Sequence, residues 1–125
     1  MKDKILIIDD SPANLESLAD FFSEDYAVDT ANSSKEAFEK VQKERYRVLI
    51  MDVKMPEMDG IQLYRGLRAY DPNFKVVFYS AYPGEYEKAR QCSEIGVYVR
   101  KGKVEDLEAL ISAVDNLAKG GSNDA

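Results

Sequence analysis

Five side chains of the sequence are of the types needed to bind a cation and to carry phosphoryl chemistry. They are Asp9, Asp10, Asp52, Ser80 and Lys101. Carboxylates about 4 Å apart repel each other by on the order of 4 kcal/mol per pair at an effective dielectric constant of about 20, so three of them together require a cation. An all-oxygen ligand set selects a hard ion. Mg²⁺ suits it best, because this ion binds few protein carboxylates and retains water and phosphate oxygens.

The same residues could form an aspartyl phosphate. An aspartate beside Mg²⁺ and the Lys101 ammonium is placed to attack a phosphoryl group, because the two cations neutralise charge on the equatorial phosphoryl oxygens. The Ser80 hydroxyl could then donate a hydrogen bond to a phosphoryl oxygen that is present only after transfer. This chemistry requires that the fold bring the five side chains to one place.

The composition excludes several other kinds of chemistry. The chain has 125 residues, 45% of them hydrophobic and 32% charged, which is typical of one packed domain. Its formal net charge of −6 would repel a nucleic acid. The absence of histidine and the single cysteine exclude histidine-dependent catalysis, an internal disulfide and cysteine-cluster metal sites. No apolar run approaches the roughly 18 residues of a membrane span, so we expect a cytoplasmic protein with no membrane or nucleic-acid partner.

Apolar runs that predict strands alternate with segments that predict helices. The expected strands cover residues 4–8, 26–31, 48–51, 76–79 and 97–99. The expected helices cover residues 12–23, a segment capped by Ser33 and Glu36, residues 61–67, a short polar segment around 85–92, and residues 104–117. This alternation predicts a parallel sheet with right-handed crossovers and helices on both faces.

Parallel sheets of this kind place their sites at the carboxyl ends of the strands. The polar residues fall there: Asp9 and Asp10 after the first strand, Asp52 after the third, Ser80 after the fourth and Lys101 after the fifth. If the first and third strands are neighbours, about 4.8 Å apart, the three carboxylates converge. The spacing alone leaves that adjacency open.

Four segments of the sequence carry a resemblance to a known family. They are IIDDSP at 7–12, MDVKMPEMDG at 51–60, FYSA at 78–81 and VYVRK at 97–101. In this order and spacing they resemble the receiver domain of bacterial two-component response regulators. The resemblance implies a flavodoxin-like, doubly wound, five-stranded parallel sheet of order 2-1-3-4-5 with five helices. It assigns residues 1–119 to the domain and residues 120–125 to a flexible tail.

The resemblance also implies roles for the acidic residues. Asp52 would be the phosphoacceptor. Asp10 would bind Mg²⁺ directly and Asp9 mostly through water, and the carbonyl of Lys54 would be a third protein ligand.

Further roles implied by the resemblance concern the phosphorylated state. Ser80 and Lys101 would hold the phosphoryl oxygens, and Tyr98 would move inward as Ser80 turns toward the phosphate. The phosphoryl group would come from the phosphohistidine of a histidine kinase or from a phosphotransfer protein. The fourth helix, fifth strand and fifth helix would form the surface that signals to a downstream protein or to a second copy of the chain.

Other functions on the same fold are weighed against this one. A flavin or nucleotide binder would place amides or hydroxyls after the first strand, where Asp9 and Asp10 would repel phosphate. A haloacid-dehalogenase-type hydrolase would need an aspartate at position 54, where this chain has Lys54, so we expect no separate enzymatic turnover. The remaining alternative is a pseudo-receiver, a protein-interaction module regulated without phosphorylation. Gly102, which stands where the family usually has proline, favours this alternative, and the complete acidic set argues against it.

Overall fold

The computed structural model describes residues 2–52, 60–71, 74–80, 97–100 and 104–119. The strands are β1 (Lys4–Ile8), β2 (Ala27–Ala31), β3 (Val48–Met51), β4 (Lys75–Ser80) and β5 (Val97–Arg100). They form one parallel sheet in the order β2-β1-β3-β4-β5. The predicted flavodoxin-like α/β architecture with a parallel sheet is therefore confirmed.

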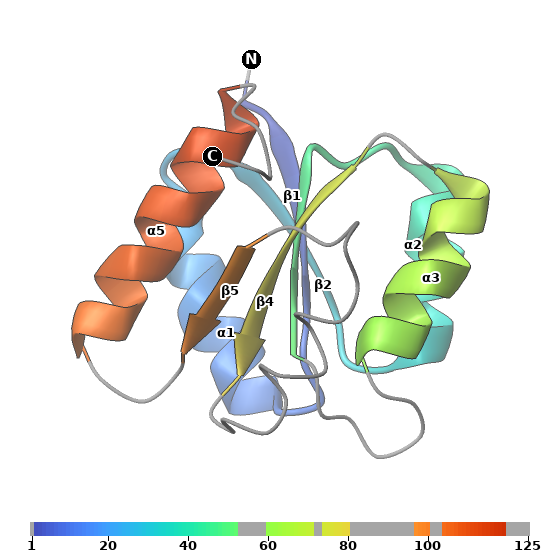
Figure 1. Ribbon diagram of the computed structural model, residues 1–125, viewed down its shortest axis with the longest axis horizontal. Coiled ribbons are helices and arrows are strands. Elements are labelled where there is room, and N and C mark those ends of the chain that lie inside the picture. Colours follow the sequence, from blue (N-terminus) through green and yellow to red (C-terminus); the bar gives the residue numbers. More distant parts are fainter. Residues whose placement is uncertain (1, 53–59, 72–73, 81–96, 101–103, 120–125) are drawn as a thin grey trace.

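Helices cover both faces of the sheet. Those in the described residues are α1 (Pro12–Phe22), α2 (Ser34–Lys43), α3 (Gly60–Tyr70) and α5 (Val104–Ala118). Figure 1 shows α1 and α5 on one side of the sheet and α2 and α3 on the other. The segment around 85–92, for which the sequence predicts a further helix, lies outside the described residues.

The two faces explain why the central strands are continuously apolar. Leu6 and Ile8 of β1 face the core beneath α2 and α3, whereas Ile5 and Ile7 face the core beneath α1 and α5. All four side chains are at most 1% exposed. A strand that is buried on both sides needs apolar residues at every position, not at alternate ones.

Serine side chains begin the first two helices, as predicted. Ser11 Oγ accepts a hydrogen bond from Asn14 N–H, and Ser33 Oγ accepts one from Glu36 N–H. The Glu36 carboxylate accepts from Asn32 N–H at 2.8 Å, so it satisfies a backbone donor one residue before the cap. These bonds replace intrahelical partners that the first turn lacks.

Several element boundaries differ by a few residues from the prediction. The second strand begins at Ala27 and not at residue 26, because Tyr26 N–H donates to Phe22 O at 2.9 Å in the turn after α1. The first helix ends at Phe22, with Ser23 as its C-cap. The fourth and fifth strands extend to Ser80 and Arg100 because backbone pairing continues there. Within the described residues, no helix is long and apolar enough to cross a membrane.

Candidate functional site

The pairing of β1 with β3 brings the aspartates of the two strand ends together. Ile8 lies opposite Met51, the last residue of β3. Asp52 N–H donates to Ile8 O at 3.0 Å, and Asp9 N–H donates to Ala31 O at 3.1 Å. Hydrogen bonding between strands thus continues one residue past both ends, which holds the backbones of Asp9 and Asp52 at the carboxyl edge of the sheet.

Three carboxylates form one cluster at this edge. One oxygen from each of Asp9, Asp10 and Asp52 lies within 4.8 Å of the corresponding oxygens of the other two. Their environments differ, since Asp9 is only 3% exposed, Asp52 is half-buried and Asp10 is exposed. The cluster therefore opens to solvent on the Asp10 side.

Neutral donors from the start of α1 hold the buried carboxylate. Ser11 N–H donates to Asp9 Oδ1 at 3.0 Å, and Asn14 Nδ2 donates to Asp9 Oδ2 at 3.4 Å. The sequence identifies Ser11 as a cap, but Asn14 was not among the predicted site residues. Its position in the sequence could have identified it. Asn14 is the third helical residue after the Ser11 cap, so it lies in the turn next to the end of β1.

The cluster fits a divalent cation by both geometry and donor type. Mg²⁺ binds oxygen at about 2.1 Å, so oxygens on opposite sides of the ion are about 4.2 Å apart. The three carboxylate oxygens lie within 4.8 Å of one another, which is close to this separation. All three donors are carboxylate oxygens, which Mg²⁺ prefers. Asp9, Asp10 and Asp52 could therefore hold such an ion.

The remaining predicted residues are only partly described. Ser80 is the last residue of β4 and pairs with Arg100, and Tyr98 pairs with Phe78, so the backbones of Ser80 and Tyr98 lie near this edge of the sheet. The structure does not describe their side chains. Lys54, Lys101 and Gly102 lie outside the described residues.

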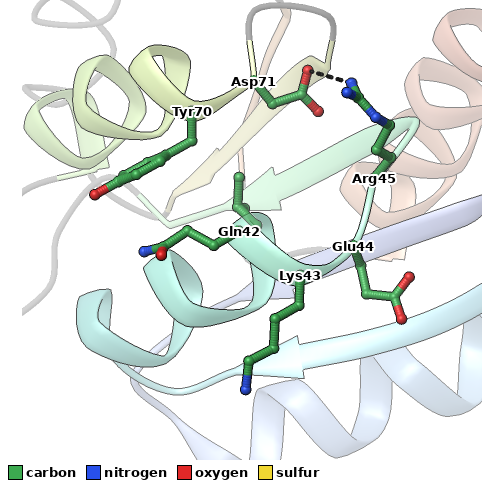
Figure 2. Close-up of a pocket in the computed structure, with 7 residues that line it drawn as sticks. Gln42, Lys43, Glu44, Arg45, Tyr70 and Asp71 are labelled. Atoms are coloured by element: carbon green, nitrogen blue, oxygen red, sulfur yellow. Dashed lines mark ion pairs between the residues drawn. The ribbon is translucent and has the colours of Figure 1, made fainter.

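Two cavities of the described residues lie at the opposite, amino-terminal edge of the sheet. One, of about 370 Å³, lies between the ends of α2 and α3, where Arg45 and Asp71 form an ion pair at 3.7 Å (Figure 2). The other, of about 410 Å³, includes Tyr26 and Asp115. Neither of these two cavities is lined by Asp9, Asp10 or Asp52.

Comparison with known proteins decides which family this arrangement belongs to. Residues 5–115 match the family model of the response regulator receiver domain. The chain belongs to this family. The receiver domain is 32% identical over 115 residues to sporulation initiation phosphotransferase F of Bacillus subtilis, covering 91% of this chain and 92% of that protein. It is 33% identical over 113 residues to the transcriptional regulatory protein GlrR of Escherichia coli, where it covers 90% of this chain but only 25% of the relative.

Solved structures show the same fold. The receiver domain matches response regulator TrrA of Thermotoga maritima, solved in complex with Mg²⁺-BeF, with a TM-score of 0.81 and 29% identity over 94% of this chain and 99% of that one. It matches the receiver domain of Francisella response regulator 1452 with a TM-score of 0.82 and 28% identity over 95% of this chain and 98% of that one. Membership of the response regulators, expected from the four sequence segments, is confirmed.

Proposed function

We propose that this receiver domain accepts a phosphoryl group on Asp52 in a Mg²⁺-dependent reaction. The observation that carries the proposal is the carboxylate cluster, in which two adjacent strand ends bring three acidic side chains within 4.8 Å. Such a cluster opposes its own formation through charge repulsion unless a cation joins it. Its oxygen donors and its opening to solvent suit a small divalent ion together with a phosphoryl donor.

In the proposed reaction, a carboxylate oxygen of Asp52 forms a bond to phosphorus while the bond from phosphorus to a histidine nitrogen of the donor breaks. The electron pair of the broken bond stays on the imidazole, and the product is an aspartyl phosphate. Mg²⁺, when bound, supplies positive charge next to the phosphoryl oxygens. Asp10 would hold the ion directly, Asp9 mostly through water, and the Lys54 carbonyl would complete the protein ligands.

The proposal extends to the residues that would respond to phosphorylation. Ser80 and Lys101 would hold the phosphoryl oxygens, and Tyr98 would move inward when Ser80 turns. The end of β4 and the start of the final helix flank this region, so a change there could alter a surface that a partner reads.

The proposed partners follow from the family. Receiver domains interact with histidine kinases or phosphotransfer proteins, and we assign this chain a place in such a cytoplasmic phosphorelay. The Bacillus subtilis relative supports a relay role, because it is named a phosphotransferase and this chain covers 92% of its length. The output would pass to a downstream protein through the surface formed by the helix predicted around residues 85–92, β5 and α5, with homodimerisation as one form of that output. We take residues 1–119 as the functional unit.

Intact-mass spectrometry after incubation with acetyl phosphate and Mg²⁺ tests the proposal. We expect the wild type to gain the mass of one phosphoryl group, and we expect the gain to disappear in Asp52→Asn or after chelation of the metal. Glu16→Gln, an exposed acidic position on α1, is the matched control and should still gain the mass. A gain that persists in Asp52→Asn would assign the phosphoryl group to another residue and contradict the proposal.

The same measurement tests the pseudo-receiver alternative. Gly102, which stands where the family usually has proline, favours this alternative. A pseudo-receiver would show no phosphoryl mass in the wild type, even at high acetyl phosphate and Mg²⁺ concentrations.

A further inference from the structure

The first turn of α1 contacts both oxygens of the Asp9 carboxylate. Ser11 N–H donates to Oδ1 at 3.0 Å, and the side-chain amide of Asn14 donates to Oδ2 at 3.4 Å. Asn14 N–H in turn donates to Ser11 Oγ, also at 3.4 Å. The first turn of α1 and its cap therefore contact the buried Asp9 carboxylate through one backbone donor, Ser11 N–H, and one side-chain donor, the Asn14 amide.

Donors on two different oxygens fix the orientation of a carboxylate. The torsion that rotates the Asp carboxylate is broad and lacks sharp minima, so without external bonds the group samples many angles. Asp9 is only 3% exposed, so these protein donors take the place of much of its hydration. An ionised carboxylate offers about four lone-pair sites on its two oxygens, so one carboxylate can both accept hydrogen bonds and coordinate a cation or a metal-bound water.

The neutrality of the Asn14 amide matters as much as its position. A lysine or arginine at the same place would also hold Asp9, but its charge would cancel one carboxylate of the cluster and repel a divalent ion. An amide orients the carboxylate and leaves its full negative charge available. Asn14 therefore combines the two properties that a support for a metal-binding carboxylate needs.

We propose that Asn14 is a positioning residue of the Mg²⁺ site and that it acts through Asp9. This inference rests on the proposed function, because it concerns the affinity of the same site for its ion. Residues that hydrogen-bond the ligands of a metal typically change metal affinity by about 10-fold to 100-fold, and Asp9 is proposed to hold the ion mostly through water. The 3.4 Å separation between Asn14 Nδ2 and Asp9 Oδ2 is long for an N–H···O bond, so we expect a change of about 10-fold, at the lower end of that range.

Substitution of Asn14 can separate positioning from a structural role. Asn14→Ala removes the amide but keeps the backbone N–H that Ser11 Oγ accepts, and alanine is the most favourable residue for a helix. Asn14→Leu removes the amide while keeping a side chain of similar length. Ser17→Ala changes an exposed position one turn further along α1 and is the matched control.

Mg²⁺ titration of the full chain, followed by backbone amide NMR shifts of residues 9–14 and by the thermal unfolding temperature, measures the affinity. We expect the half-saturating Mg²⁺ concentration to rise about 10-fold in both Asn14 variants and to stay at the wild-type value in Ser17→Ala. The unfolding temperature without Mg²⁺ should remain near that of the wild type in Asn14→Ala.

The rate of phosphorylation by acetyl phosphate gives a second, independent reading. Across a Mg²⁺ series, the half-saturating concentration should shift as in the titration. The plateau rate should stay within about twofold of the wild type, because positioning affects metal binding and not the attack by Asp52. A wild-type Mg²⁺ affinity in Asn14→Ala, or a lower unfolding temperature with no change in affinity, would overturn this inference alone. A wild type that neither binds Mg²⁺ nor gains a phosphoryl group would overturn the proposed function with it.

Discussion

The three clustered aspartates carry the same charge in different surroundings. Asp9 is buried and accepts hydrogen bonds from Ser11 and Asn14, whereas Asp10 is exposed. Repulsion among them is largest at low ionic strength, and it persists at 0.1 M salt because the oxygens lie within 4.8 Å, closer than the screening length of about 10 Å. Repulsion within the cluster therefore opposes folding, and a divalent ion that binds the proposed site would contribute to stability.

Replacement of Asp10 by asparagine should change the free energy of unfolding in opposite directions without and with Mg²⁺. Without Mg²⁺, we expect Asp10→Asn to raise the free energy of unfolding by about 1 kcal/mol, because one like charge is removed at a solvent-screened position. With saturating Mg²⁺ we expect Asp10→Asn to be less stable than the wild type, since the variant lacks a carboxylate that is proposed to bind the ion. Urea unfolding at low salt with and without Mg²⁺ measures the difference, with Glu16→Gln as the control for net charge. If Asp10→Asn and Glu16→Gln change the free energy of unfolding equally, the closeness of the three carboxylates has no effect of its own on stability.

At the level of secondary-structure elements, the contact between α2 and α3 depends on a glycine. A Cβ atom placed on Gly66 would lie 2.7 Å from Cζ of Phe38, closer than atoms in contact allow. The Phe38 ring also packs edge-on against Tyr70, one turn after Gly66, with ring centroids 5.9 Å apart. The missing side chain on α3 thus provides the space into which the ring from α2 fits.

Gly66→Ala should therefore have different effects in two backgrounds. Alanine is more favourable than glycine inside a helix by about 1 kcal/mol, but in the wild type it must displace the Phe38 ring. We expect a stability change near zero or negative in the wild type, and a gain of about 1 kcal/mol in the Phe38→Ala background. Chemical denaturation of the double-mutant cycle measures the coupling. The same change in both backgrounds would contradict the proposed steric contact.

At the level of the whole molecule, two buried tyrosines connect elements that are distant in sequence. Tyr26 OH donates to Asp115 of α5 at 2.5 Å, and Tyr46 OH donates to Asp29 of β2 at 2.7 Å. Burial, together with these hydrogen bonds to carboxylates, raises the pKa of both tyrosines above the ordinary value of 10.0. Ionisation of either phenol would place a negative charge beside the carboxylate to which it donates.

The raised pKa values predict loss of stability at alkaline pH. Below pH 10 the phenols are protonated in both states, and their contribution to stability is fully present. As pH rises above 10, the unfolded chain releases these protons first, so the free energy of unfolding should fall by at most about 1.4 kcal/mol per pH unit for each tyrosine. Denaturation from pH 8 to 12 should show a smaller slope for Tyr26→Phe and for Tyr46→Phe. Tyr70→Phe, which changes an exposed ring, is the matched control, and a similar change of slope there would contradict the assignment.

Patterns within a few residues were sufficient to predict much of this protein. The apolar runs at β1 and β3 and the serine caps at Ser11 and Ser33 are correct because such features depend on contacts along one segment of chain. The same patterns placed Asp9, Asp10 and Asp52 at strand ends. The motif order around them was enough to indicate the receiver family.

Residue patterns alone left open which of these segments meet; the family resemblance implied the sheet order 2-1-3-4-5, and the tertiary structure shows it. The pairing of β1 with β3 brings Asp52 to Asp9 across more than 40 positions of sequence, and no local pattern specifies which parallel strands become neighbours. The support of Asp9 by Asn14 and the fit of Phe38 over Gly66 likewise depend on how helices pack against strands and against each other. The physical reason is that periodicity and capping energies act within about one turn or one strand, whereas strand neighbours and side-chain contacts result from packing the whole chain around two cores.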